Sequence, residues 1–398
     1  MKGKTQMKTM FKTMMFSGLF ASLAWSLGAA AGEKDLEMAV LPGADLVTRF
    51  DVQKLMATPF YQEIKKEDPA KLAVKNPDWA KVEDFFTQIG IKAEDIGNVL
   101  LTVDLDIPAD RAELKDEKAL FLVGVESAKP WDLKKLSEAV MKAAKGDGEK
   151  TEIETLTIEG TPVLKIKTTK ERPGAVAKAA DDGKPADPAA VAKTEAVYLT
   201  VIGNDKVLLL SQFEAEMKAA VSRAKAQQPA VLDPKLAAIA AAVPGAQVSG
   251  GFIMPAVLKQ QLQVKPDAQK PEGFNPFGGV QEAFRSLQLV GWSVACDKDA
   301  AIQVKCGLGS KEDAAKGGLA LNGLVGMFNG LLAMQQGQPQ ADPNAEIGIK
   351  LLQNLKVSNL EQDVIFDLLF PSTLIAKTKA MAAEQAKKVP IIAPAQEE

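Results

Sequence analysis

The sequence predicts an α+β protein made of two tandem modules, each a mainly antiparallel sheet with helices packed on one face. First, Pro42-Gly43-Ala44 followed by Phe50 recurs with the same spacing as Pro244-Gly245-Ala246 followed by Phe252. Second, the strand and helix patterns after these two segments come in the same order. Third, successive apolar runs are joined by short turns, which favours antiparallel pairing.

In the first half, we expect two successive strands, then a helix that begins after Ser127, then a closing hairpin whose turn is Gly203-Asn204-Asp205. A serine before an apolar-periodic run is a typical helix N-cap. The expected ranges are strands 99–105 and 119–125, helix 130–145, a β-rich segment 156–167, strands 197–202 and 206–210, and helix 211–225.

The second half repeats this order, with a helix after Ser310 and a turn near Glu361-Gln362. The expected ranges are strands 287–296 and 301–308, a helix from 311 to about 334, strands 355–359 and 363–370, and a helix from 371 to about 387. This parallel order of elements is the basis for predicting a duplicated module.

The first 31 residues are typical of a secretory signal peptide. A stretch with four lysines precedes an apolar run over 14–27, which ends in Ala29-Ala30-Ala31. The alternative is a retained membrane anchor, but the run contains serines and ends in small residues. We therefore expect cleavage before Gly32, no transmembrane segment after cleavage, and a soluble chain in the periplasm or outside the cell.

Composition shifts divide the rest of the chain. The two modules are predicted at 32–229 and 230–388, with a flexible tail at 389–398. Residues 170–194 are rich in alanine, proline, lysine and aspartate and lack apolar periodicity, so they are predicted to be a disordered loop. Smaller loops of the same kind are predicted at 265–279 and 337–346.

The chain contains no histidine and two cysteines. This composition excludes catalysis that depends on histidine, and it excludes a thiolate zinc cage. The formal net charge of −3 becomes more negative when the four lysines of the signal are removed, which argues against nucleic acid as a partner.

The two cysteines, Cys296 and Cys306, are predicted to be free and buried. A three-residue loop at 298–300 would pair Trp292 with Cys306 and Cys296 with Ile302, and thus keep the apolar faces of both strands together. The two cysteines would then lie roughly 13 Å apart along the hairpin, too far for a disulfide.

Two segments could form an apolar ligand or partner surface. The first is an aromatic stripe at helical spacing, with Trp79, Phe85 and Phe86, whose alternative is a core face. The second is the run 317–334, in which only Asn322 and Asn329 are strongly polar. In that run the candidate surface residues are Gly323, Gly326, Phe328 and Gly330, and the alternative is a central core helix.

Two other motifs are better explained as structural. The aspartates Asp104, Asp106 and Asp110 lack the glycine and the terminal glutamate of an EF-hand, and we interpret them as a solvated strand end. The segment 307–310, Gly-Leu-Gly-Ser, lacks the third glycine of a dinucleotide site and has no Gly-Lys-Ser. We therefore assign no catalytic, cofactor-binding or metal-binding residues.

The opening Leu41-Pro42-Gly43-Ala44, followed by an apolar strand, Asp51 and Leu55, resembles that of a group of uncharacterised exported bacterial proteins. The resemblance rests on a short and degenerate L-P-x-x strand–helix motif. It implies an envelope or periplasmic protein and brings no known activity or site residues.

The sequence thus favours a non-catalytic exported protein that acts by binding or assembly, with an unknown protein or an apolar ligand as its partner and no cofactor. One alternative is a soluble carrier of an apolar or lipid-like ligand. Another is a hydrolase that uses serine, lysine or carboxylate chemistry in place of histidine.

Overall fold

The computed structural model describes residues 36–65, 85–105, 119–144, 150–171, 192–240, 245–255, 284–336 and 343–374, with the single residues 259, 280, 282 and 377. The chain forms two compact units. The first contains Met1–Ala57 and Tyr61–Pro255, and the second contains Thr58–Phe60 and Ala256–Glu398. Both units combine antiparallel strands with helices, which confirms the predicted α+β class.

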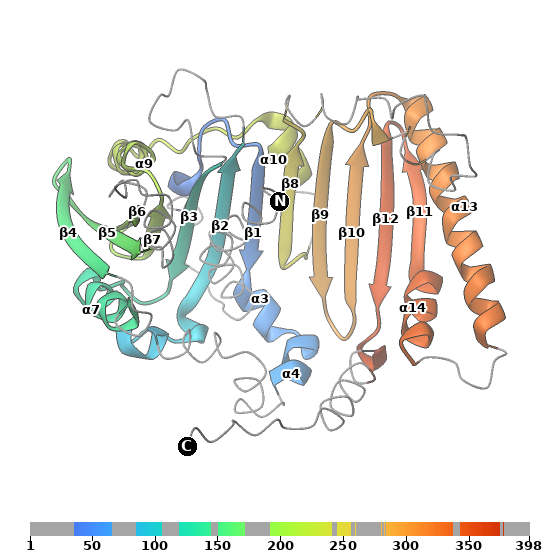
Figure 1. The fold of residues 1–398 in the computed structure, drawn as a ribbon, viewed down its shortest axis with the longest axis horizontal. Helices are drawn as coiled ribbons and strands as arrows, with labels where there is room; N and C mark the ends of the chain where they lie inside the picture. The colour runs from blue at the N-terminus through green and yellow to red at the C-terminus, as the bar shows by residue number, and fades with distance from the viewer. Residues whose placement is uncertain are drawn as a thin grey trace, which may run out of the picture. The chain divides into compact units, whose positions relative to one another are not determined.

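The sheet of the first unit has the strand order β8-β1-β2-β3-β7-β6-β5-β4 (Figure 1). Neighbouring strands pair antiparallel throughout. The central strand β3 is buried along its whole length, as expected for a strand covered on both faces. The strands are β1 (Leu46–Asp51), β2 (Ile96–Asp104), β3 (Leu120–Ser127), β4 (Lys150–Ile158), β5 (Thr161–Glu171), β6 (Ala192–Ile202), β7 (Val207–Ser211) and β8 (Val248–Ile253).

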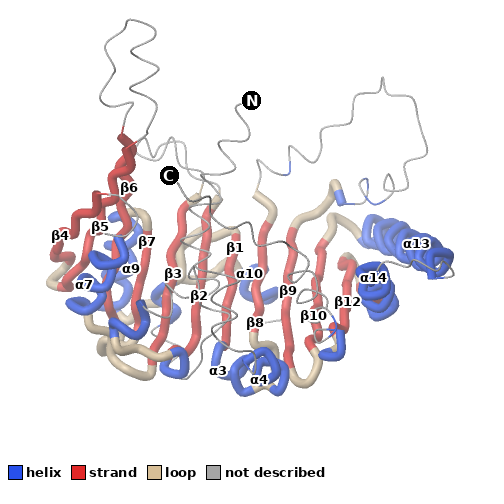
Figure 2. The backbone as a smooth tube through the Cα atoms, turned by 60° about the horizontal axis from the view of Figure 1, so that its bottom comes forward, coloured by secondary structure: helices blue, strands red, loops and turns tan. Residues whose placement is uncertain are grey.

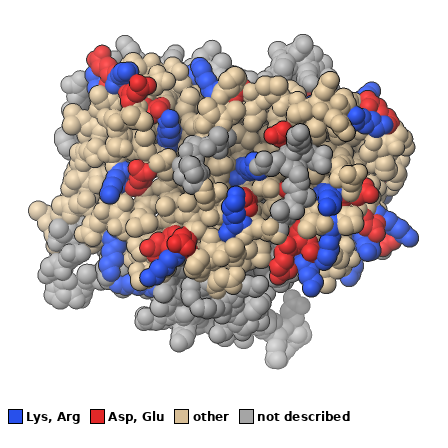
Figure 3. Space-filling view, turned by 180° about the vertical axis from the view of Figure 1, so that it is seen from behind, with Lys and Arg blue, Asp and Glu red and all other residues tan. Residues whose placement is uncertain are grey.

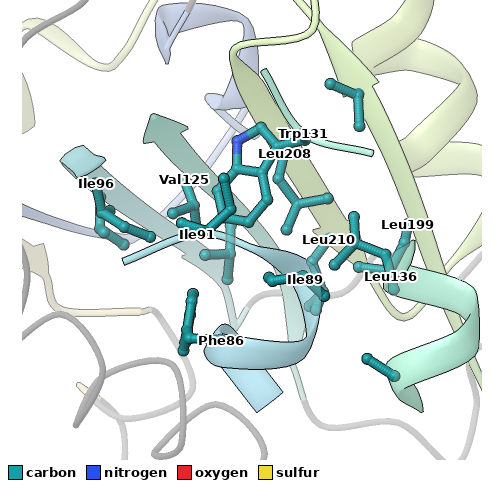
Figure 4. Close-up of a cluster of buried hydrophobic side chains, with 14 of the residues drawn as sticks. Phe86, Ile89, Ile91, Ile96, Val125, Trp131, Leu136, Leu199, Leu208 and Leu210 are labelled. Carbon is teal, nitrogen blue, oxygen red and sulfur yellow. The ribbon is translucent and has the colours of Figure 1, made fainter. Parts of the chain in front are cut away.

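One face of this sheet carries the main hydrophobic core (Figure 4). Helix α7 (Leu133–Ala144) contributes Leu136 and Ala139 to it, and the segment 85–91 contributes Phe86, Ile89 and Ile91. Its strand residues alternate along the sheet, as the two-residue period of a strand requires: Val99, Phe121, Val123, Val125, Leu164, Ile166, Leu199, Val201, Leu208 and Leu210.

The opposite face is covered as well, by η1 (Glu37–Ala39), α9 (Glu214–Ala226) and α10 (Pro234–Ala240). A Cβ added to Gly124 would lie 2.5 Å from Ala39 Cβ, so η1 approaches strand β3 closely. The predicted arrangement, with helices on one face of the sheet, is therefore wrong for this unit. The amphipathic pattern of a single helix does not show which face of the sheet it covers.

The remaining short helices of the chain are α3 (Val52–Ala57), α4 (Pro59–Lys65) and η2 (Ala93–Asp95). Strands β4 and β5 form a hairpin whose turn, Glu159-Gly160, has positive φ at both residues. The predicted turn between β6 and β7 is present, with positive φ at Gly203, Asn204 and Asp205.

The predicted disordered loop at 170–194 is too long. Its first two residues belong to β5 and its last three to β6, and these strands pair as far as Glu171 and Ala192. Main-chain hydrogen bonds between two strands can extend a hairpin beyond its apolar residues, which the composition of the segment could not reveal. Residues 172–191 lie outside the described residues.

The sheet of the second unit has the order β11-β12-β10-β9, again antiparallel. Its strands are β9 (Leu289–Cys296), β10 (Ala300–Gly307), β11 (Leu355–Leu360) and β12 (Asp363–Phe370). Helices α13 (Lys311–Gln336) and α14 (Pro343–Asn354) lie next to each other and contact β11 and β12 (Figure 2). The prediction missed α14, because the loop expected at 337–346 covers its first turn.

The two faces of this second sheet differ in polarity. One carries the cross-strand partners Trp292, Val304 and Phe366, and part of it packs beneath α13 around Cys306, Leu308, Ala314 and Val364. The other carries the hydrogen bond from Gln303 to Asp367 and the ion pair between Lys305 and Asp363.

Neither Cys296 nor Cys306 forms a disulfide, and both are buried, as predicted. The predicted register of their hairpin is wrong by two residues: Cys296 pairs with Ala300, and Cys306 pairs with Val290. The loop is Asp297 to Asp299, and it keeps the same residues on the same face. A shift by an even number of residues preserves the buried face, so hydrophobic alternation could not distinguish the two registers.

The order β2-β3-β7-β6 in the first unit matches the order β9-β10-β12-β11 in the second. In each case a helix follows the second strand and a hairpin closes the set. The compact units divide at Pro255, whereas the predicted module boundary at 229/230 rests on the repeat and stays a prediction. The predicted signal at 1–31, the loop at 265–279 and the tail at 389–398 lie outside the described residues.

Candidate functional site

Helix α13 begins directly after β10, where the sequence provides a good N-terminus. The hydroxyl of Ser310 accepts a hydrogen bond of 3.1 Å from the Asp313 amide. Glu312 and Asp313 lie in the first turn, where negative charge favours the helix dipole. Glu312 also forms an ion pair with Lys316, one helical turn further on.

The first turns of α13 are packed against the second unit. Ala314 is fully buried, and Leu321 packs on the cluster around Cys306. Gly318 lies so close to Asn359 that a side chain at this position would displace the asparagine amide. Asn322 donates to the carbonyl of Val357 at 3.3 Å and so attaches the helix to strand β11.

The side of α13 that faces away from Ala314 and Leu321 is exposed and apolar. Leu319 is 77% exposed, Leu331 51% and Met334 78%. We call this surface the α13 apolar face, which consists of Leu319, Gly323, Gly326, Gly330, Leu331 and Met334. Apart from Leu331, its members follow one another at spacings of three and four residues, which align them along the helix.

The three glycines of this face are not needed for packing against any described residue. A Cβ added at Gly323, Gly326 or Gly330 would meet nothing within 4 Å. Each glycine costs about 1 kcal/mol relative to alanine in an exposed helix interior. At Gly318, close packing against Asn359 offsets this cost. At the other three glycines, no contact within the described part of the chain does so.

Charged side chains are absent from residues 317–336 of the sequence. Elsewhere, on the face drawn in Figure 3, basic and acidic side chains of the described residues lie next to one another. Ion pairs of the described residues include Lys305 with Asp363 and Lys167 with Glu154, each with an N–O distance of 2.9 Å. Contacts at the α13 apolar face must therefore be mainly hydrophobic.

The structure separates the surface residues proposed from sequence. Phe85 and Phe86 lie in the first unit, where Phe86 is buried and the two rings pack edge to face with centroids 5.8 Å apart. Their position matches the alternative of a core face (Figure 4). Trp79 lies outside the described residues.

Gly323, Gly326 and Gly330 lie together on the exposed side of α13. Phe328, which is 36% exposed, is seven residues from Leu321 and so lies on the packed side of the helix. The alternative of a central core helix is wrong, because most described positions of α13 after Leu321 are exposed or partly exposed. Leu319, Leu331 and Met334 were not predicted from the sequence, although the spacing of Leu319 and Met334 from the glycines could have identified those two.

A buried carboxylate lies in the first unit, at Glu126 of β3. It is fully buried, and its Oε2 accepts hydrogen bonds from the backbone and the side-chain amide of Asn98, at 3.2 and 2.9 Å. The Asn98 side-chain oxygen accepts from the Arg49 guanidinium at 3.4 Å. Glu126 Oε1 has no partner among the described residues. This network connects three neighbouring strands at the irregularity in the β2–β3 register.

A second, partly buried polar contact fixes the first described segment of the chain. Arg223 of α9 donates to the carbonyls of Met38 and Val40, at 3.1 and 2.8 Å. Burial lowers the pKa of Arg223, although nearby Glu216 opposes this effect. The contact attaches η1 to α9. Its role in this structure is to hold the buried apolar segment around Met38 and Val40 in place.

The motifs set aside in the sequence have structural roles here as well. Gly307 lies against Leu289 and Asp363, and the Leu308 amide donates to the Gln362 carbonyl at 2.9 Å. Ser310 caps α13. Asp104 ends β2, while Asp106 and Asp110 lie outside the described residues. Within the described ranges, acidic residues and cysteines form no group of three that could hold a metal ion.

Among the described helices, none is long and apolar enough to cross a membrane. No family model matches the sequence, and a comparison with curated proteins found no significant match. Two structures of TP0453 are similar to this chain. Crystal form I has a TM-score of 0.35 and 9% identity over 89% of this chain and 98% of the other. Crystal form IV has a TM-score of 0.38 and 11% identity over 88% and 99%. These scores are too low to support an inference about function.

Proposed function

We propose that this chain is a non-catalytic exported protein of the periplasm or cell envelope that acts by binding or assembly through the α13 apolar face. The observation that carries this proposal is an exposed helix side that combines Leu319, Leu331 and Met334 with three unpacked glycines. Exposed apolar surface is costly in water, and a contiguous patch of it commonly marks a binding site.

Export is supported by the signal-like segment and by the position of the first buried residues. Leu36, Met38 and Leu41 are buried in the first unit, and Leu36 follows the expected cleavage site before Gly32 by only a few residues. Cleavage at that site would keep these described buried residues in the mature chain.

The absence of catalysis is supported by the chemistry of the chain. The sequence has no histidine. The buried carboxylate of Glu126 and the partly buried guanidinium of Arg223 are engaged in contacts that hold strands and helices together.

We also propose that the two modules arose as a tandem repeat. The matching strand orders β2-β3-β7-β6 and β9-β10-β12-β11 support this proposal, as does the position of α7 and α13 after the second strand of each set. The first set then differs mainly by the hairpin β4–β5, which comes where the second set has α14.

A carrier of an apolar ligand is the second candidate function. The cluster beneath α13 has few fully buried members, and several of its apolar neighbours are only partly buried, including Val290, Leu321 and Phe366. A lipid-like molecule in contact with these side chains would complete their burial. Such a ligand would bind on the packed side of α13 and not on the α13 apolar face.

Native mass spectrometry of the protein isolated from the exported fraction of its own host tests both candidates. We expect a mass above that of the single chain, lost when Leu319→Lys and Met334→Lys are combined. Val231→Lys is the matched control, because Val231 is 84% exposed and lies outside α13.

A wild type that carries no other protein or lipid and also stays a single chain in concentrated solution would contradict the proposal. A bound species that survives in the double variant would exclude the α13 apolar face. If that species has the mass of a lipid, the carrier is favoured.

A further inference from the structure

The α13 apolar face has the geometry of a self-complementary helix seam, and we infer that its partner is a second copy of this chain, with the two α13 helices antiparallel. This inference rests on the proposed function, because it names the partner of the same surface. A two-fold axis requires that the same patch on both copies be complementary to itself.

The order of residues along the face meets this requirement. An antiparallel pair with its axis between Gly326 and Met327 places Leu319 opposite Met334, and Gly323 opposite Gly330. Large side chains then meet at the two ends of the seam and glycines meet near its centre. Opposed glycines allow two helix backbones to approach closely.

The distribution of charge favours the antiparallel direction. Lys311, Glu312, Asp313 and Lys316 occupy the first turns of α13, and the residues from 317 to 336 carry no charge. In the antiparallel arrangement these charged turns extend beyond the partner's Gln336. In a parallel pair, Lys316 would lie next to the second copy of Lys316, and Glu312 next to the second copy of Glu312. Like charges at such positions destabilise a helix pair.

The size of the seam sets the expected affinity. From Leu319 to Met334 the helix is roughly 22 Å long, at about 1.5 Å per residue. A contact between two such helix faces is smaller than the roughly 1,200–2,000 Å² of a standard interface. We therefore expect a weak dimer, with a Kd on the order of 10–100 μM.

Sedimentation velocity of the full exported chain from about 1 to 300 μM, a range that spans this Kd, tests for the dimer. We expect the average mass to rise toward two chains in the wild type. In the variant Gly323→Glu/Gly330→Glu we expect a single chain at every concentration, because four carboxylates would meet at the seam. This variant should keep its helix content, because glutamate favours helix more than glycine does.

Gly348→Glu is the matched control. Gly348 lies in α14, and a Cβ there also meets nothing within 4 Å, so this variant should form dimers like the wild type. A wild type that remains a single chain at 300 μM would overturn the inference. Dimers that persist in Gly323→Glu/Gly330→Glu would also overturn it.

Cysteine cross-linking tests the direction of the pair. Under mild oxidation, Leu319→Cys alone and Met334→Cys alone should form no covalent dimer, and a mixture of the two should form one. The native thiols are buried, and the wild type provides the background. Cross-linking of Leu319→Cys with itself would show a parallel pair and refute the proposed arrangement.

The two proposals fail in different ways. If the purified chain stays monomeric but the protein from its host carries another protein or a lipid that depends on Leu319 and Met334, the dimer is wrong and the binding function stands. If neither material carries a partner, both proposals are wrong.

Discussion

Helices α7 and α13 occupy the same place in the order of elements but use their apolar residues differently. Helix α7 buries Leu136 and Ala139 in the core of the first unit and exposes Lys134, Lys135, Glu138 and Lys142. Helix α13 packs its first turns and leaves Leu319, Leu331 and Met334 exposed. Packing thus explains the apolar residues of α7 but only some of those in α13. The remaining apolar residues of α13 are the ones for which we propose a partner.

The comparison is tested most strongly by truncating one leucine in each helix. Leu136→Ala should lower the free energy of unfolding by about 2–5 kcal/mol, because it removes a fully buried side chain and leaves a cavity. Leu319→Ala should change it by less than about 0.5 kcal/mol, since this side chain is largely exposed. Urea unfolding at 1 μM or less, well below the expected dimer Kd, measures both. Equal losses in the two variants would show that α13 is packed on both sides.

Gly124 tests close packing on the second face of the first unit. The change Gly124→Ala should destabilise the protein by about 1–3 kcal/mol, because the new Cβ would lie 2.5 Å from Ala39 Cβ and 2.9 Å from Leu36 Cδ1. Thermal unfolding followed by circular dichroism measures the loss. A variant as stable as the wild type would mean that η1 is not held against β3.

Cys306 tests the core beneath α13. Burial, with a smaller effect from Asp363, raises the pKa of the Cys306 thiol from 9.0 to about 11. A raised pKa means that the folded state binds the proton more tightly. The stabilisation is therefore complete below about pH 9 and is lost as the pH rises toward 11.

Between pH 8 and pH 11, wild-type protein should lose about 2 kcal/mol more stability than Cys306→Ala, at about 1.4 kcal/mol per pKa unit. Urea unfolding at both pH values measures the difference. The same loss in both proteins would show that the thiol is accessible to water.

Thiol titration of the denatured, unreduced wild type should find two free groups per chain.

The smallest effect is expected at the exposed glycines, and it has the opposite sign. Gly326→Ala should stabilise the monomer by about 1 kcal/mol, because the added Cβ meets nothing and alanine favours helix. Unfolding at 1 μM or less, where the proposed weak dimer would be dissociated, isolates this effect. A loss of stability would indicate that another part of the chain contacts the α13 apolar face.

Local pattern predicted most strands in this chain and the helices α7, α9 and α13. Turn residues and apolar alternation identified the hairpin β6–β7 and the hairpin β11–β12, which form through contacts between near neighbours in sequence. Helix α14 was missed because its first turn follows a segment rich in glutamine, glycine and proline. The buried, disulfide-free state of Cys296 and Cys306 was also predicted, because the predicted and the observed register both keep the apolar face and separate the two cysteines along the hairpin.

The tertiary structure decided which surfaces are covered. The sequence of α13 was compatible with a core helix and with an exposed one, because apolar composition is the same in both cases. Only the positions of β11, α14 and the cluster around Cys306 showed that the packed side of α13 carries Ala314 and Leu321 and that Leu319 and Met334 lie outside. Likewise, the placement of η1, α9 and α10 on the second face of the first sheet depends on contacts such as Arg223 with Met38, between residues far apart in sequence. Burial depends on which elements meet in space, and periodicity along a single element does not contain that information.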